Sequence, residues 1–375
     1  MVIPDAPALH SLEVPQPITV VGAGVFGVWT AWRLRCAGAS VRLVDAWGPG
    51  HSRSSSGDET RAIRMGYGAD EIYTRLAMRS LALWQEFGHG IFQPTGVLWM
   101  AREDNPYSVA TVRTLTAAGV EFETVTDLAR RWPQMQQSDP RVFGIFEPRS
   151  GALFARRGVA AVAADAIRMG VQYETAAISA DPLPDGPTVF ACGPWLPKLF
   201  PDLLAKRIFP TRQEVFFFAP PPGDTRFAPG ALPVWIDFTD PRGPYGFPDL
   251  ESRGIKVALD RHGPRIDPDT LDRRPTPEAL ADVRAFLAER FPALADAPLT
   301  ETRVCQYENT SSGDFLIDRH PERSDIVLVG GGSGHGFKHG PAVGELAARL
   351  ILENEPPDPR FSLATKVTVQ HRAVW

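Results

Sequence analysis

Residues 18–27 read Ile-Thr-Val-Val-Gly-Ala-Gly-Val-Phe-Gly, and this stretch decides the expected fold. Its β-branched run ends in glycine, which is typical of a buried parallel strand. Gly22 permits a tight turn, Gly24 allows the backbone to approach a pyrophosphate, and Gly27 lets the following helix pack closely on the strand. The spacing therefore predicts a dinucleotide site at a helix N-terminus, where free N–H groups and the helix dipole favour phosphate.

The next strand supplies an acid in the place that such a site requires. A helical pattern covers about residues 25–37, and residues 40–44 form a second strand that ends at Asp45. Asp45 follows Gly24 by about 20 residues, where a carboxylate can accept hydrogen bonds from both ribose hydroxyls. Strand, helix and acid together predict a Rossmann-type βαβ unit.

Composition limits the class of protein. The chain has 375 residues, enough for two domains or for one large domain with an insertion. A net charge of −5 favours neither nucleic acid nor an anionic membrane surface as a partner. Residues 1–17 lack a signal-peptide pattern, and no apolar run approaches the ~20 residues of a membrane span. Because Cys36, Cys192 and Cys305 include no close pair, we expect a cytoplasmic protein without structural disulfides.

The order of helical and strand-like segments predicts an α/β fold with two domains. Short buried strands are expected at residues 188–191 and 326–329, whereas residues 208–219 and 254–260 indicate a β-rich region. We therefore expect a discontinuous Rossmann-type cofactor domain, with a β-sheet-rich substrate domain inserted twice. The cofactor domain is assigned residues 17–80, 146–206 and 311–375, and the substrate domain residues 81–145 and 207–310.

A second stretch favours FAD over NAD as the cofactor. Residues 51–68 read His-Ser-Arg-Ser-Ser-Ser-Gly-Asp-Glu-Thr-Arg-Ala-Ile-Arg-Met-Gly-Tyr-Gly. They resemble the segment after the second strand in monomeric sarcosine oxidases and N-methyltryptophan oxidases, within the D-amino acid oxidase-like superfamily of FAD-dependent oxidoreductases. Similar stretches follow in matching order, among them Glu147–Phe154, Cys305–Tyr307 and Gly334–Lys338. This resemblance covers about residues 17–355 and implies an FAD enzyme that oxidises a small amine bearing a carboxylate.

The resemblance also implies which residues contact the flavin. Cys305 falls where the family forms a thioether to the flavin C8 methyl group, so a covalent flavin is expected, although a lone cysteine is more often a small core residue. Thr60 and Arg61 match residues beside the flavin, with Arg61 on the face opposite Lys256. The flavin-side loop is expected to comprise Gly334, His335, Gly336, Phe337 and Lys338.

Two cations are expected to hold the substrate carboxylate. By resemblance, Arg64 and Lys338 clamp this group, and two buried cations do require an anion. The family lysine that matches Lys256 lies over the flavin and promotes electron transfer to oxygen, where a positive charge stabilises the superoxide that forms. A structural ion pair for Arg64 and a solvent-facing position for Lys256 stay open as alternatives.

Asp260 departs from the family pattern. Sarcosine oxidase-like sequences carry a histidine four residues after the lysine, whereas an acid at this place could pair with a cationic or hydroxylated substrate. Residues 55–57, Ser-Ser-Gly, also replace a paired-histidine stretch near the flavin. No Cys/His or His/Glu spacing suits a metal, and none is expected. The expected catalytic residues are Lys256, Arg61, Arg64, Lys338, Asp260 and Tyr307.

The resemblance implies a reaction in which a neutral amine gives a hydride equivalent to the flavin. The imine is then hydrolysed, and O2 reoxidises the flavin to yield H2O2. Two alternatives on the same scaffold are a dehydrogenase that passes electrons to a carrier and an oxidase of cyclic imino acids or sugar-modified amino acids. A third is a flavin-binding protein without turnover, although binding alone needs no carboxylate clamp. We expect a monomer without a nucleic-acid or membrane partner.

Overall fold

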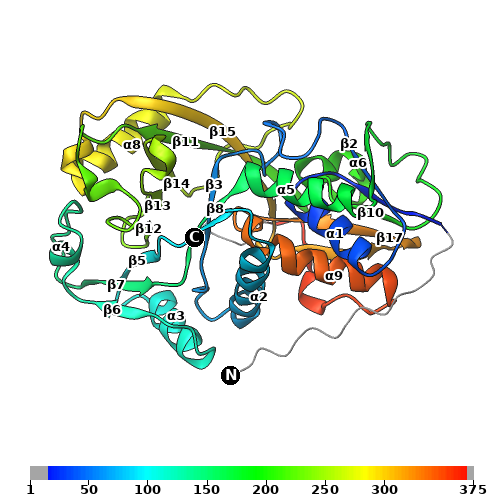
Figure 1. The fold of residues 1–375 in the computed structure, drawn as a ribbon, viewed down its shortest axis with the longest axis horizontal. Helices are drawn as coiled ribbons and strands as arrows, with labels where there is room; N and C mark the ends of the chain where they lie inside the picture. Colours follow the sequence, from blue (N-terminus) through cyan, green and yellow to red (C-terminus); the bar gives the residue numbers. More distant parts are fainter. Residues whose placement is uncertain (1–15, 370–375) are drawn as a thin grey trace.

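The computed structural model describes residues 16–369, and the stretch up to residue 15, on which most of the signal-peptide expectation rests, lies outside this range. Within it, two large sheets occupy opposite ends of the molecule, with helices packed around each (Figure 1). None of the helices described is both long enough and apolar enough to cross a membrane. The arrangement confirms the predicted α/β class.

A six-stranded sheet forms the first layer. All neighbouring strands in it are parallel except the last hairpin, β16–β17. Helices α1 (Val25–Cys36), α5 (Ala155–Arg168) and α9 (Gly340–Leu352) pack together at this end of the molecule. The strand order is β16 (Leu316–His320), β17 (Arg323–Gly330), β10 (Thr188–Phe190), β1 (Ile18–Val21), β2 (Val41–Asp45) and β9 (Gln172–Thr175).

The turn after β1 shows why two of its glycines are required. Gly22 has a φ of +102°, and a Cβ there would lie 2.4 Å from the carbonyl oxygen of Ala191. A Cβ on Gly27 would lie 1.7 Å from the carbonyl oxygen of Gly22. Both positions therefore exclude any side chain, because Gly22 lies against the segment after β10 and Gly27 lies in helix α1 against the turn that precedes it.

An eight-stranded, mainly antiparallel sheet forms the second layer. Only β5 and β12 run parallel in it. Helix α8 (Pro277–Arg290) covers this sheet through a core that includes Phe218, Trp235, Phe286 and Phe291. The strand order is β15 (Leu299–Thr310), β11 (Ile208–Phe218), β14 (Ile255–Leu259), β13 (Pro244–Phe247), β12 (Val234–Asp237), β5 (Val97–Arg102), β7 (Val142–Glu147) and β6 (Glu123–Val125).

A three-stranded sheet joins the two layers, in the order β3 (Thr60–Ile63), β8 (Gly151–Phe154) and β4 (Phe92–Gln93). The remaining α-helices are α2 (Glu71–Phe87), α3 (Pro106–Ala117), α4 (Leu128–Arg131), α6 (Leu196–Leu199) and α7 (Pro201–Leu204). The 3-10 turns are η1 (Gly193–Trp195), η2 (Thr225–Phe227), η3 (Leu250–Ser252), η4 (Pro292–Leu294), η5 (Phe337–His339), η6 (Pro359–Phe361) and η7 (Leu363–Thr365).

The strands fall into the predicted groups of segments. Every strand of the six-stranded sheet lies in a segment assigned to the cofactor domain, and nearly all of the eight-stranded sheet lies in segments assigned to the substrate domain. The predicted boundaries at residues 80 and 145 fall inside α2 and β7, so the domain limits stay a prediction. Strand β15, which the sequence pattern did not predict, contributes Cys305 and Tyr307 to the region between the sheets.

Candidate active site

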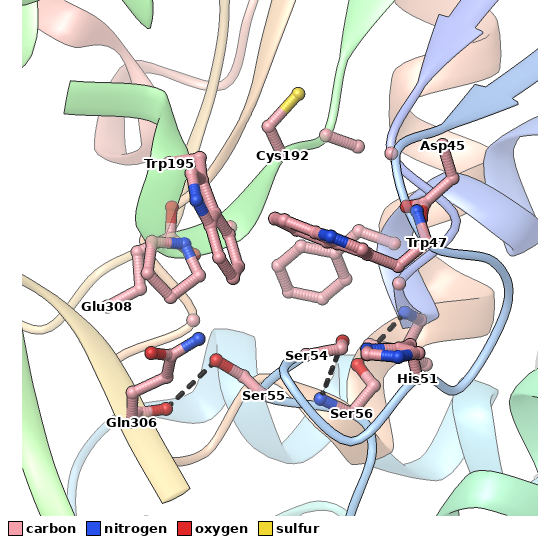
Figure 2. A pocket seen from close by; sticks show the side chains of 18 of the residues that line it. Asp45, Trp47, His51, Ser54, Ser55, Ser56, Cys192, Trp195, Gln306 and Glu308 are labelled. Carbon is pink, nitrogen blue, oxygen red and sulfur yellow. Dashed lines mark hydrogen bonds between the residues drawn. The ribbon is translucent and has the colours of Figure 1, made fainter. Parts of the chain in front are cut away.

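A large cavity opens at the carboxyl ends of β1, β2 and β10, where ligands bind in open parallel sheets. We call it the main cavity. It measures about 1470 Å³, including the part open to solvent. The turn at residues 22–26, the loop at 45–56, the segment at 191–195 and strand β15 form its walls (Figure 2). Together with residues 176–178 and 332–337, they bring distant parts of the sequence to the predicted dinucleotide site.

Gly24 lines the main cavity without any steric need for glycine from the protein itself. A Cβ at this position would meet only Ser56 Oγ at 3.6 Å and Ser54 Oγ at 3.8 Å. The space that a side chain would fill is therefore left open in front of α1, whose N-cap makes no side-chain hydrogen bond. This is the cradle that a pyrophosphate requires, whereas Gly27 has a purely structural task.

Asp45 is held in place by backbone amides. Its Oδ1 accepts hydrogen bonds from the N–H groups of Trp47 at 2.8 Å and Gly48 at 2.7 Å, and its Oδ2 accepts one from Ala23 N–H at 2.7 Å. A carboxylate has about four acceptor sites, so these three bonds leave capacity for a ribose hydroxyl. The same bonds fasten the loop after β2 to the glycine turn.

Two tryptophans lie side by side at the main cavity. The rings of Trp47 and Trp195 have centroids 4.8 Å apart at an angle of 51°, and Figure 2 shows Trp47 near Asp45 and Trp195 near Cys192. Trp195 Nε1–H donates to Asp269 Oδ1 at 2.7 Å, which fixes that ring. Flat aromatic surfaces of this kind suit a planar heterocycle such as adenine.

Two buried polar groups in the main cavity escaped the sequence analysis. Gln306 Oε1 and Glu308 Oε1 are buried without a hydrogen-bond partner among residues 16–369. Burial raises the pKa of Glu308 to about 7, although the backbone N–H groups of Gly331 and Gly332 oppose the rise. Unpaired buried acceptors are costly, and a ligand that carries several hydroxyl groups would satisfy them. The cradle, the acid and these acceptors therefore fit FAD.

A second cavity, here called the inner cavity, adjoins the main cavity. It measures about 850 Å³ and reaches from β3 to the aromatic residues of β13. The two cavities share six lining residues, so a ligand in one touches the walls of the other. The shared residues are Arg61, Cys305, Tyr307, Ser333, Gly334 and Phe337.

Asp58 joins two of the predicted cations. Lys256 Nζ donates to Asp58 Oδ2 at 2.8 Å and to the carbonyl oxygen of Thr60 at 2.8 Å, and Arg61 Nη1 donates to the same Asp58 oxygen at 2.6 Å. Lys256 is 2% exposed and Asp58 is 5% exposed. Burial alone would raise the pKa of Asp58, but the two cations outweigh it and hold that pKa well below its usual range. The group therefore carries one net positive charge.

Lys256 and Arg61 share the Asp58 carboxylate, but they differ in which cavities they line. Arg61 lines both the main and the inner cavity, whereas Lys256 does not line either of them. The lysine lies between the rings of Phe217 and Phe247, with Nζ 5.9 Å and 5.0 Å from their centroids. A strand lysine facing solvent is thus excluded.

Arg64 lies buried on the wall of the inner cavity. Its guanidinium is sandwiched between the rings of Tyr67 and Trp99, with Cζ 4.3 Å and 4.2 Å from their centroids. It donates to the carbonyl oxygen of Gly66, and no carboxylate of the described chain lies within salt-bridge distance. A structural ion pair, the alternative for this residue, is therefore absent from the described part, and a buried cation faces the cavity.

Lys338 reaches the inner cavity from η5. Its Nζ donates to Tyr67 OH at 2.7 Å and to the carbonyl oxygen of His335 at 2.9 Å. Tyr67 also contacts His339 Nε2 at 2.8 Å, so one phenol connects the lysine with a buried histidine. Burial, followed by the charges of Lys338 and Arg64, holds the pKa of His339 well below its usual value. The histidine is therefore neutral at neutral pH.

Tyr307 and Asp260 also line the inner cavity. Tyr307 OH donates to Asp260 Oδ1 at 2.9 Å, and Tyr245 is hydrogen-bonded to the same phenol. Burial, then the charge of Asp260, raises the pKa of Tyr307 well above its usual value. The tyrosine ring also packs against Gly334, where a Cβ would approach it to 2.6 Å. An acid and two phenols thus lie in the same cavity as the two cations.

Cys305 lies at the junction of the main and inner cavities. Arg61 Nη2 donates to its Sγ at 3.6 Å, and the thiol is only partly buried. Cys192 also lines the main cavity, where its Sγ–H donates to the carbonyl oxygen of Val21 at 3.3 Å. Of these two cysteines, only Cys305 lines both cavities.

The tertiary structure brings together most of the predicted residues, around two cavities. Asp58, Tyr67, Gln306 and Glu308 belong to the site but were not predicted. Asp58 and Tyr67 lie in the quoted stretch 51–68. For Asp58, an acid between arginines in that stretch was a usable signal. No group of His, Cys, Asp and Glu among residues 16–369 could hold a metal ion.

A comparison with protein families decides the class. The family described as FAD dependent oxidoreductase matches residues 17–350. The chain belongs to this family. The predicted cofactor, FAD, and the predicted enzyme class are thereby confirmed for this oxidoreductase.

Curated relatives agree with this assignment. The chain is 34% identical to a monomeric sarcosine oxidase from Bacillus sp. (strain B-0618), over 89% of this chain and 92% of the relative. It is 27% identical to an N-methyl-L-tryptophan oxidase from Yersinia pestis (strain Pestoides F), over 92% of this chain and 98% of the relative. The resemblance seen in the sequence motifs thus extends over nearly the whole chain.

Solved structures share the fold. Fructosamine oxidase (Amadoriase II) from Aspergillus fumigatus superposes with a TM-score of 0.78 at 24% identity, over 95% of this chain and 91% of the other. L-proline dehydrogenase from P. horikoshii gives a TM-score of 0.77 at 23% identity, over 93% and 96% of the two chains. These likenesses concern the arrangement of helices and strands.

Proposed function

We propose that this FAD-dependent oxidoreductase oxidises the C–N bond of a small secondary amine or N-substituted amino acid, with O2 as the electron acceptor. One observation carries the proposal: the buried guanidinium of Arg64 faces the inner cavity without a carboxylate of the described chain within salt-bridge distance. A substrate carboxylate would supply the missing anion. The relatives named sarcosine oxidase and N-methyl-L-tryptophan oxidase support the choice of an amine.

The protein's own residues would bind and orient the substrate. Arg64 offers a planar guanidinium held between two rings, and Lys338 offers an ammonium held by Tyr67 and by the carbonyl oxygen of His335. Because both cations are fixed before the substrate arrives, little side-chain entropy is lost on binding. The carboxylate would anchor one end of the substrate and so place its C–N bond beside the junction with the main cavity.

Bound FAD would supply the redox chemistry, taking a hydride equivalent from the carbon next to the amine and passing the electrons to O2. The protein must keep the amine neutral at that step, because an ammonium has no lone pair to assist hydride loss. We therefore expect kcat/KM to rise with pH through an amine ionisation. A flat profile between about pH 6 and 10 would contradict this scheme.

Asp260 and Tyr307 would contact the substituent on the substrate nitrogen. They lie in the inner cavity with the two cations, so one end of the substrate meets positive charge and the other meets an acceptor. This polarity supports a substituent that carries a hydroxyl group or a positive charge. Tyr245 and Phe247, which line the same cavity, add aromatic surface beyond what a methyl group needs.

Cys305 would hold the flavin covalently through a bond from Sγ to the C8 methyl carbon. One hydrogen leaves the thiol and one leaves the methyl group, and O2 takes up the two electrons. The position of Cys305 at the junction of the two cavities supports this bond. The test is acid denaturation: the yellow colour should stay with the polypeptide and should wash free in Cys305→Ser.

The decisive experiment measures peroxide release under air from the purified protein with a panel of N-substituted amino acids. Arg64→Met should raise KM for a carboxylate substrate by about 10- to 100-fold, because a charge-assisted hydrogen bond is lost. Arg75→Met is the matched control, since Arg75 lies on the surface of α2 with 66% of its side chain exposed. Flavin reduction without peroxide would indicate a dehydrogenase instead, and an unchanged KM would refute the clamp. We further propose that the protein is a cytoplasmic monomer, and gel filtration can test the monomeric state.

A further inference from the structure

A third cavity lies on the other side of the Lys256–Asp58 ion pair. This side cavity measures about 500 Å³ and has Lys256 and Thr60 at its buried end. Arg157 and Glu251 line its exposed end, where Arg157 Nη2 and Glu251 Oε1 form an ion pair 2.8 Å long. The side cavity therefore runs from the protein surface to the buried ammonium.

The ion pair separates the side cavity from the inner cavity. Asp58 lines the inner cavity, Lys256 lines the side cavity, and Thr60 and Phe247 line both. Lys256 Nζ lies 2.8 Å from Asp58 Oδ2, so the paired side chains of Lys256 and Asp58 lie between the side cavity and the inner cavity. A small molecule in the side cavity could contact the lysine without entering the cavity that would hold the substrate.

Part of the wall of the side cavity is apolar, and Glu59, Thr60, Arg157, Glu251 and Arg253 line the rest. Phe217 and Phe247 flank the ammonium, and Pro248 and Leu250 are buried farther out. Apolar surface of this kind is poorly hydrated and admits small apolar molecules. Dioxygen is apolar before reduction and anionic after it gains an electron. Apolar rings beside a buried cation match both states.

The loop at the outer end of the side cavity is strained. Glu251 has a φ of +56° and Ser252 a φ of +59°, both in the left-handed region that side chains disfavour. Gly254 follows with a φ of +102°, and a Cβ there would lie 2.8 Å from the carbonyl oxygen of Phe218. Strain of about 1 kcal/mol or more per residue persists where a particular backbone shape is required. Here it holds Leu250 and Glu251 at the opening of the side cavity.

We propose that the side cavity is the route by which dioxygen reaches Lys256, separate from the path of the amine. The proposal rests on the oxidase function proposed above. Each dioxygen takes two electrons from the reduced cofactor and two protons, and leaves as hydrogen peroxide. Lys256, held by Asp58 and Thr60, presents its positive charge where the first electron arrives. The amine stays in the inner cavity and does not pass the Lys256 ammonium.

Xenon pressurisation of crystals tests occupancy directly, because xenon enters apolar cavities. The wild-type protein should show xenon beside Phe217 and Leu250. Leu250→Trp should fill the space and remove that xenon. Leu299→Trp is the matched control, since Leu299 is 36% exposed and does not line the side cavity. Absence of xenon from the wild-type side cavity would overturn the proposal.

Stopped-flow measurement of reoxidation provides the second test. The flavin is first reduced with dithionite, so the measured rate of reoxidation does not depend on any amine. Leu250→Trp should lower the second-order rate constant with O2 by about tenfold, while anaerobic reduction by an amine should change less than about twofold. Phe154→Trp narrows the same cavity and serves if Leu250→Trp does not fold. Fast reoxidation in a variant whose side cavity is filled would refute the route alone, whereas slow reoxidation of the wild type would also refute the oxidase function.

Discussion

Replacement of Asp58 by asparagine should lower the free energy of unfolding by about 4 kcal/mol at neutral pH. Asp58 is 5% exposed and accepts from Lys256 at 2.8 Å and from Arg61 at 2.6 Å. Asparagine keeps the shape but leaves two buried cations without their shared anion. Removing one partner of a buried ion pair typically costs about 3–5 kcal/mol.

The Coulomb energy of the Lys256–Asp58 pair supports the expected loss of about 4 kcal/mol. Two unit charges 2.8 Å apart attract by about 6 kcal/mol at an effective dielectric constant of 20. Lys256 can relieve part of the loss in Asp58→Asn by releasing its proton, because burial already lowers its pKa. The net loss should therefore be smaller than the full attraction.

The loss should depend on pH in a defined direction. In Asp58→Asn the pKa of folded Lys256 lies below that of the unfolded chain, so the unfolded state binds more protons between these two values. Stability of the variant then rises with pH through this range, and the gap to wild type narrows towards about pH 10. The low pKa of Asp58 determines the behaviour in acid. As the pH falls and this carboxyl is protonated, the wild-type protein loses the stabilisation that the ion pair contributes.

Urea unfolding followed by tryptophan fluorescence at about pH 7 and 9.5 measures both effects. Glu174→Gln is the control, because its ion pair with Arg42 is exposed and should contribute less than about 1 kcal/mol. A double-mutant cycle with Lys256→Met isolates the pair itself. A loss below about 1 kcal/mol in Asp58→Asn, or a loss that does not change with pH, would refute the reasoning.

Three further predictions concern the main cavity and the helix that borders it. Gly24→Val should leave the urea midpoint nearly unchanged but lower flavin content by about tenfold or more, because its side chain would occupy the open cradle; full flavin content would refute the cradle. Gly27→Ala should instead unfold the protein readily, since no room exists beside Gly22, and a stable variant would contradict this. Burial raises the pKa of Glu308 to about 7, so the folded state holds this proton more tightly than the unfolded chain. The free energy of unfolding of the wild-type protein should therefore fall by about 3 kcal/mol between pH 4.5 and 7. Glu308→Gln should abolish this pH dependence. Urea titrations of apoprotein in a Cys305→Ser background measure this last effect, and parallel pH profiles for the two proteins would refute it.

Local patterns in the chain were enough to predict the glycine turn and the first βαβ unit. The β-branched run at residues 18–21, the glycine turn and Asp45 interact across only about 25 residues, and their backbone requirements are strict. Strand β15 was not predicted, because residues 300–303 are all polar and give no apolar alternation, and its first half is only partly buried. Its pairing with β11 is long-range and leaves no local mark.

The sequence by itself determined the βαβ turn, the alternation of segments and the residue types available for FAD and carboxylate binding. Only the tertiary structure decided which of these residues meet. Asp58 became the partner of Lys256 because two segments about 200 residues apart pack together, and burial then made their charges interdependent. Whether a charge faces a ligand, a partner or solvent depends on the distances and dielectric around it, and folding of the whole chain sets both.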